Sequence, residues 1–200
     1  MRRTLISVLM TVVLLGTSNA SPEEAQAAFT SGQSRMRAND LVGAQTDFEL
    51  AVEKSPDNTQ YLSDLGMVYL RTGQAKAAAK TYERMCSITE SEFGALSSRI
   101  FGCHTLWGNA LLMSQDVRGA AEKFRSAHTA AMAQTPRIVS DCLMSLYSLT
   151  YTLNSLGRLA EAEQLYEKLL SETPESSRYQ PQVKAALQAV REGKLPPRLQ

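Results

Sequence analysis

Residues 61–86, YLSDLGMVYLRTGQAKAAAKTYERMC, contain the two amphipathic segments that decide the fold. On each side of a break at Thr72-Gly73, apolar side chains recur three and four positions apart, which is the spacing of one face of a helix. The stretch therefore predicts a helical hairpin. Such a hairpin is apolar on both of its sides and cannot bury both alone, so neighbours of the same kind are expected.

The same pattern continues along the chain. We expect helices and hairpins over residues 22–38, 41–54, 57–93, 96–134, 136–171 and 180–192. The last helix carries its apolar residues on one face, as a helix that covers the end of a stack would: Val183, Ala186, Leu187 and Val190. No stretch alternates like a strand, so the predicted fold class is all-α.

Small and aromatic residues recur at corresponding positions of the four hairpins. The small residues are Gly32, Gly66, Gly108 and Thr150. The aromatic residues are Phe48, Tyr82, Phe124 and Tyr166, and the alanines between the two sets are Ala44, Ala78, Ala120 and Ala162. This pattern resembles the tetratricopeptide repeat (TPR), a helix–turn–helix unit, and the resemblance covers residues 25–176. Small residues let two helices approach closely, and the aromatic ring fills the space between them.

The spacing of the repeats changes along the chain. Gly32 and Gly66 are 34 residues apart, whereas Gly66 to Gly108 and Gly108 to Thr150 are 42 residues each. Eight extra residues correspond to about two helical turns, so the later hairpins should have longer helices. This resembles the 42-residue TPR variety of kinesin light chains. The resemblance implies a right-handed α-solenoid of about four hairpins plus the C-terminal capping helix.

The resemblance also implies a binding surface. In TPR proteins the first helix of each unit lines a concave groove that binds an extended or helical peptide. By position, that groove here would contain Gln33, Arg37, Met67, Arg71, Asn109, Met113, Tyr147, Tyr151 and Asn154. The set mixes polar and apolar anchors. It lacks the Lys/Asn/Arg carboxylate clamp of the TPR proteins that bind chaperone tails, so we do not expect a chaperone tail as the ligand. The alternative is that these residues only fill or solvate a face.

Residues 1–20 have the pattern of a secretory signal peptide. Arg2 and Arg3 precede a short apolar run, residues 5–16, and Ser18-Asn19-Ala20 is a small-x-small cleavage signal. An uncleaved anchor is the alternative. We therefore expect a mature TPR domain over residues 21–192, a flexible tail over residues 193–200, and export to the periplasm, with full secretion as an alternative.

The charge balance excludes one class of partner. The whole chain carries 21 basic and 20 acidic residues, and residues 1–20 contain two of the basic ones and no acid. The mature chain is therefore close to neutral and has no run of Lys or Arg, which argues against nucleic acid. It also has no second apolar run of membrane length, so no stable membrane insertion is expected after cleavage.

Three cysteines in an exported chain can form a disulfide. If the turn between their helices lies near Phe93-Gly94, Cys86 and Cys103 come to the same height on facing helices, and we expect this pair if both point inward. Cys142 is an alternative partner for Cys103, and buried free thiols are the third possibility.

The histidines suggest no metal or catalytic site. Adjacent helical residues point about 100° apart, so Cys103 and His104 should not share a ligand geometry easily. His128 could approach Cys142, but two groups do not complete a zinc site. No third orienting group and no phosphate loop is visible, so we expect no enzyme and no cofactor.

These patterns favour a binding module. We expect an exported TPR adaptor that holds a segment of another protein in the assembly of an envelope, secretion or pilus complex. A structural repeat protein that associates with itself is the alternative, and an enzyme is a remote one.

Overall fold

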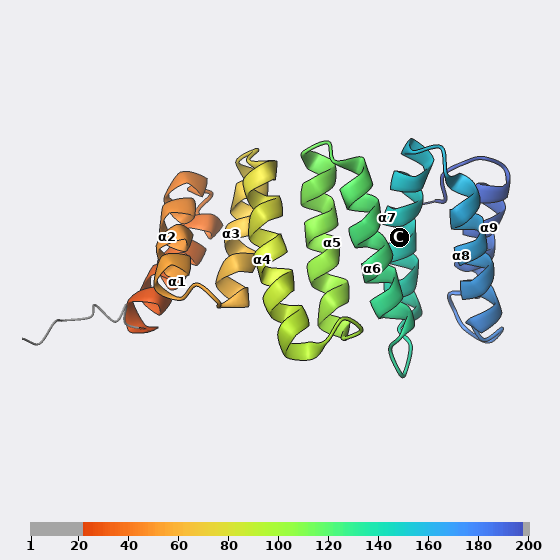
Figure 1. Ribbon diagram of the computed structural model, residues 1–200, viewed down its shortest axis with the longest axis horizontal. Coiled ribbons are helices and arrows are strands. Elements are labelled where there is room, and N and C mark those ends of the chain that lie inside the picture. Colours follow the sequence, from red (N-terminus) through yellow and green to blue (C-terminus); the bar gives the residue numbers. More distant parts are fainter. Residues whose placement is uncertain (1–21, 198–200) are drawn as a thin grey trace, which may run out of the picture.

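The protein is all-α, as predicted. The computed structural model describes residues 22–197, and within them the chain forms nine helices packed as consecutive hairpins (Figure 1). The helices are α1 (Pro22–Arg37), α2 (Leu41–Lys54), α3 (Thr59–Arg71), α4 (Ala75–Phe93), α5 (Ser98–Met113), α6 (Val117–Met132), α7 (Val139–Ser155), α8 (Leu159–Glu172) and α9 (Gln180–Arg191). The predicted hairpin boundaries agree with these bounds to within about three residues. The predicted signal peptide lies outside the described residues.

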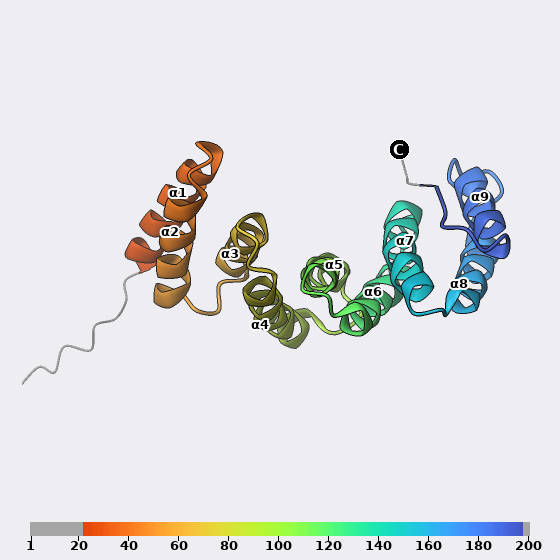
Figure 2. The ribbon, with the colours of Figure 1, turned by 90° about the horizontal axis from the view of Figure 1, so that it is seen from above.

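The hairpins are arranged as a curved row. Figure 2 shows an arch in which α3, α5 and α7 lie on the inner side, whereas α4 and α6 lie on the outer side. Each helix packs mainly against the helices before and after it in the chain. The inner side of the arch is therefore built from the first helix of successive hairpins, and this arrangement makes it the concave face.

Small residues and aromatic rings hold each hairpin together. A Cβ atom placed on Gly32 would lie 2.7 Å from the Phe48 ring, and one on Gly66 would lie 2.5 Å from the Tyr82 ring. Gly108 has the same relation to Phe124, at 2.7 Å. The three rings are almost completely buried. The glycines are therefore required because the facing ring occupies the place of their side chain.

The fourth hairpin is built differently. Its small-residue position is Thr150, which is fully buried and donates a hydrogen bond from Oγ1 to the Leu146 carbonyl at 2.6 Å. Thr150 also lies close enough to the hydroxyl of Tyr166, the aromatic partner in this hairpin, to lower its pKa against the larger effect of burial. The helices α7 and α8 contact each other less extensively than the two helices of each other hairpin. The hairpin with a threonine in place of the glycine is thus also the one whose two helices pack least extensively.

The eight extra residues of the later repeats lengthen helices, as predicted. Helix α4 has 19 residues against 14 in α2. Helix α5 starts ten residues before Gly108, whereas α3 starts seven residues before Gly66. The added residues therefore extend both helices beside the α4–α5 connection, at the place where Cys86 and Cys103 lie.

The bend of every hairpin contains one residue whose backbone is in the left-handed conformation. Asn39, Gly73, Gln115 and Gly157 all have positive φ, at 61°, 78°, 71° and 68°. These positions follow the same 34- and 42-residue spacing as the core residues. Where the bend residue is not glycine, an aspartate follows it and caps the next helix: Asp40 accepts a hydrogen bond from Gly43 N at 3.0 Å, and Asp116 accepts one from Gly119 N at 2.9 Å.

Helix α9 caps the end of the stack. The four apolar residues predicted to share one face are all buried there: Val183, Ala186, Leu187 and Val190. They join the same apolar cluster as α7 and α8. Among residues 22–197, none of the helices is long and apolar enough to cross a membrane.

Candidate functional site: the concave face

The predicted groove residues lie on α1, α3, α5 and α7, the first helices of the four hairpins. All are exposed except Gln33 and Tyr147, which are half-buried. Helices α3, α5 and α7 line the inner side of the arch in Figure 2. The residues are thus spread over four helices of the stack rather than gathered in one pocket. Such a layout can contact a long segment but cannot concentrate several groups on one reacting atom.

A buried carboxylate organises the polar part of this face. Asp64, on α3, is only 5% exposed. It accepts hydrogen bonds from Gln33 Nε2 at 3.2 Å and from Gln60 Nε2 at 3.1 Å. Asp64 therefore joins α1 to α3 and fixes the side chain of Gln33. Sequence reasoning missed Asp64, although a lone aspartate between Leu62 and Leu65 was a signal of a specific polar contact.

Arg71 is also engaged within the protein. Its guanidinium donates from Nη2 to Oδ1 of Asn39 at 2.9 Å, which links the end of α3 to the bend after α1. Both groups are exposed, so the contact remains open to exchange with a ligand.

Several large apolar side chains are exposed on the first helices. Met67 is 40% exposed, Met113 56% and Tyr151 45%. Met144 on α7 is 50% exposed and was not predicted, although it lies three residues before Tyr147 and so shares its side of the helix. Methionine and tyrosine side chains adapt to apolar partners while remaining compatible with water.

A cavity of about 680 Å³ lies between α7 and α9. Its lining contains three tyrosines, Tyr147, Tyr166 and Tyr179, together with Pro196 and Pro197 from the chain after α9. Burial raises the pKa of Tyr166 to about 12, so this hydroxyl stays neutral. Pro196, within the segment for which the sequence predicts a flexible tail, is buried at this cavity.

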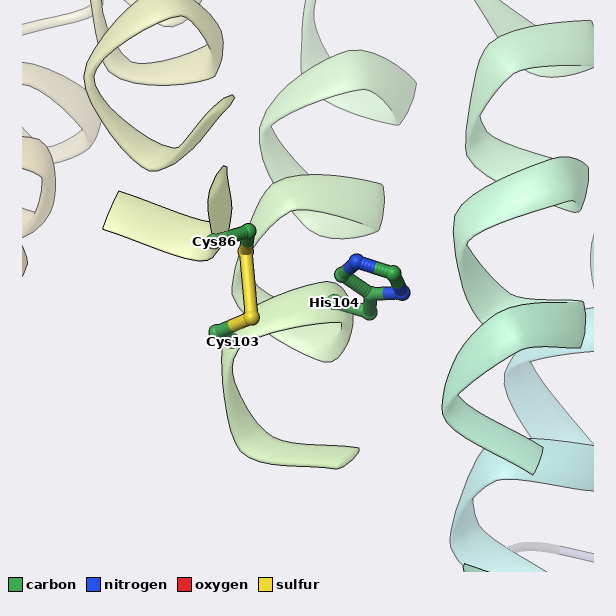
Figure 3. Close-up of side chains that lie close together, drawn as sticks. All are labelled: Cys86, Cys103 and His104. Atoms are coloured by element: carbon green, nitrogen blue, oxygen red, sulfur yellow. A yellow bond between two sulfur atoms is a disulfide. The ribbon is translucent and has the colours of Figure 1, made fainter. Parts of the chain in front are cut away.

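The structure pairs Cys86 with Cys103 as a disulfide, the pairing we expected (Figure 3). Their Cα atoms are 5.5 Å apart, within the range that a disulfide can bridge. The bond joins α4 to α5, which belong to consecutive hairpins. Cys142 is buried and free, so the alternative pairing with Cys103 is not the one observed.

His104 lies closer to the two cysteines than its place next to Cys103 on one helix would suggest. Cys86, Cys103 and His104 place their sulfur and ring-nitrogen atoms within 4.8 Å of one another, although Cys103 and His104 are adjacent on one helix. Figure 3 shows the His104 ring beside the sulfur pair. Two thiolates and an imidazole could hold a soft or borderline metal ion, but only after the disulfide is reduced.

His104 is held as a neutral ring. Burial lowers its pKa, and the nearby Lys123 ammonium lowers it further. Lys123 Nζ lies 3.8 Å from the centroid of the Trp107 ring, and His104 packs edge-on against that ring at 5.9 Å between centroids. Trp107 is thus a packing residue of α5.

His128 lies beside Cys142, as the sequence suggested. Its Nδ1 is 3.2 Å from Ser145 Oγ, and the Cys142 backbone also hydrogen-bonds the ring. Burial lowers the pKa of His128 to about 4. Burial likewise raises the pKa of the Cys142 thiol to about 11, so both groups are neutral and suited to packing rather than to nucleophilic chemistry.

A stack of close-packed helical hairpins with an open inner face defines the class of helical repeat scaffolds. The tetratricopeptide repeat family profile matches residues 29–93 and 105–177. The chain belongs to the tetratricopeptide repeat family, whose members are generally non-catalytic scaffolds for protein–protein interaction. Comparison with curated protein sequences gave no match.

Solved structures share the fold at low sequence identity. MamA is 18% identical, with a TM-score of 0.62, over 86% of this chain and 84% of that chain. The nearly identical TPR-like repeats of a Podosopora anserina kinesin light chain protein are 14% identical, with a TM-score of 0.67, over 86% and 87%. PcrH, crystallised with the chaperone binding region of PopD, is 18% identical, with a TM-score of 0.53, over 66% and 92%. The PcrH structures include one of the protein from Pseudomonas aeruginosa.

Proposed function

We propose that this protein is an exported scaffold that holds a segment of another protein on its concave face and positions it in a larger envelope assembly. The observation that carries the proposal is the exposure of apolar side chains on first helices: Met67, Met113, Met144 and Tyr151. Apolar anchors among polar neighbours suit a peptide with both kinds of side chain. The peptide-bound state of PcrH supports the same use of the fold here.

Two features support export. Residues 1–20 have the pattern of a cleavable signal peptide. The disulfide between Cys86 and Cys103 suits an oxidising compartment such as the periplasm. The export proposal is tested by mass spectrometry of the protein recovered from the periplasmic fraction, in which the chain should begin at Ser21. Recovery of a chain that retains residues 1–20 would contradict it.

The binding proposal is tested with a double variant on the concave face. Asn109→Ala with Tyr151→Ala should abolish crosslinked capture of the partner from envelope extract, because it removes one polar and one apolar anchor. The helical signal and its thermal melt should be unchanged, since both residues are exposed. A matched double variant on second helices, Val42→Ala with Gln164→Ala, changes two exposed residues away from this face and should leave capture intact. Equal capture by all three proteins would reject the concave face as the binding surface.

A further inference from the structure

The cavity between α7 and α9 contains no charged residue in its lining. With Pro196 and Pro197 in place as part of its wall, its volume is about 680 Å³, in the range of sites that bind small molecules or a few residues of a peptide. Met144 and Tyr147 come from α7, and Tyr179 and Pro181 come from the start of α9. Such a lining favours apolar groups and gives a charged segment no partner.

The chain's own C-terminal segment is seated at this cavity. After α9, Lys194 N donates to the Ala189 carbonyl at 2.9 Å. Beyond it, in the described part of the chain, residues 195–197 form no backbone hydrogen bond, yet Pro196 is buried. Figure 2 shows the segment running from α9 back toward α7 on the inner side of the arch. Apolar contact of the proline therefore holds the segment in place.

The chemistry of this contact is that of proline recognition. A residue that precedes proline is restricted to extended backbone, and proline fixes its own φ, so Leu195-Pro196-Pro197 is extended before it docks. Such segments lose little conformational entropy on binding, and tyrosine rings provide flat apolar surfaces for the proline rings. The tyrosines and the prolines of this cavity are therefore complementary.

The cavity continues the proposed binding surface. Tyr147 lines it, and Tyr151, one helical turn further along α7, is exposed beside it. We propose that this end of the concave face binds an extended, proline-containing segment of a partner protein, and that residues 194–197 of the chain itself, of which Pro196 and Pro197 form part of the cavity wall, cover the site until the partner displaces them. This inference rests on the proposed function, because it names the chemistry of the segment that the concave face would hold.

The test uses the full mature chain and a labelled synthetic peptide that copies residues 193–200, with fluorescence polarisation as the readout. A tethered segment competes at an effective concentration of about a millimolar, so wild-type protein should bind the peptide weakly. Pro196→Glu should expel the resident segment from the uncharged cavity and strengthen peptide binding by about tenfold or more. The control Gln164→Glu adds the same charge on the exposed surface of α8 and should behave as wild type.

Two further changes locate the site. In the Pro196→Glu protein, Met144→Glu should abolish peptide binding without loss of helical signal, since Met144 is half exposed. A peptide in which both prolines are replaced by serine should not bind. Equal binding by wild type and Pro196→Glu, or equal binding of the serine peptide, would overturn the proposal. So would a dimer in sedimentation velocity that Pro196→Glu disperses, because the occupant would then be the tail of a second copy.

The two proposals fail separately. If the peptide does not bind while Asn109→Ala with Tyr151→Ala still abolishes partner capture, the concave face binds its partner without this cavity. If the peptide binds and partner capture is unaffected by any concave-face variant, the cavity serves only the chain's own tail, and both the partner and the displacement are wrong.

Discussion

Alanine at Gly66 should destabilise the protein, because the facing ring occupies the place of the new methyl group. That Cβ would lie 2.5 Å from Cε1 and 2.6 Å from Cζ of Tyr82, a ring that is 1% exposed. Carbon atoms pack best at about 3.5–4 Å, so α3 and α4 must separate by about 1 Å. Overpacking costs about 1–3 kcal/mol, and the better helix propensity of alanine offsets about 1 kcal/mol of this cost, so a net loss of about 1 kcal/mol, and at most about 2 kcal/mol, is expected.

Gly102 provides the matched control. It lies inside α5, is exposed, and has no atom within 4 Å of an added Cβ. Alanine there should stabilise the protein by about 1 kcal/mol through helix propensity alone. Urea denaturation followed by far-ultraviolet circular dichroism measures both free energies of unfolding. Replacing Tyr82 by leucine should reduce the cost of Gly66→Ala, since the two sites are in contact. The reasoning is refuted if Gly66→Ala is as stable as wild type, or if both alanines change stability in the same direction.

Two further predictions concern the cysteines and His128. Replacing Cys86 and Cys103 together by alanine should lower the free energy of unfolding by about 3 kcal/mol, because the unfolded chain is then no longer constrained by a closed loop of about 17 residues. Thiol counting on the denatured wild-type protein should find one reactive thiol without reductant and three with it. Three thiols without reductant would exclude the disulfide. For His128, burial lowers the folded-state pKa from 6.5 to about 4, so the unfolded chain binds its proton first as the pH falls. The free energy of unfolding should therefore fall by about 3 kcal/mol between pH 6.5 and pH 4 because of this group. In His128→Gln, the free energy of unfolding measured by urea denaturation should depend less on pH over this range. An unchanged pH dependence would show that His128 is not buried as a neutral ring.

The hairpins could be predicted because their determinants are local and repeated. In three hairpins a glycine is followed sixteen positions later by an aromatic residue. In the structure the aromatic ring of each pair packs directly on the backbone at the glycine. The length change could be predicted for the same reason, since extra residues between two fixed packing positions must extend the helices that connect them. The positions of Cys86 and Cys103, side by side on neighbouring helices, could be predicted by counting the residues between each cysteine and the turn that joins the two helices.

The site around His104 could not be predicted by such counting. The angle between adjacent helical residues describes where their Cβ atoms point, but the His104 ring extends far enough to bring a nitrogen near both sulfurs. The role of Asp64 likewise depends on Gln33, which lies on another helix 31 residues away. Contacts of this kind depend on the distance between hairpins, which periodicity does not specify.

The fourth hairpin shows how one departure from the repeat can create a site. Thr150 occupies the position where the other hairpins have glycine, and α8 packs less extensively on α7 than the second helix of each other hairpin packs on its first. Tyr166, the aromatic partner of that position, consequently lines the cavity between α7 and α9 instead of pressing on a bare helix backbone. The break in the glycine series was visible in the sequence. Its consequence depends on α9 and on Pro196, which complete the cavity from residues that lie outside the repeat.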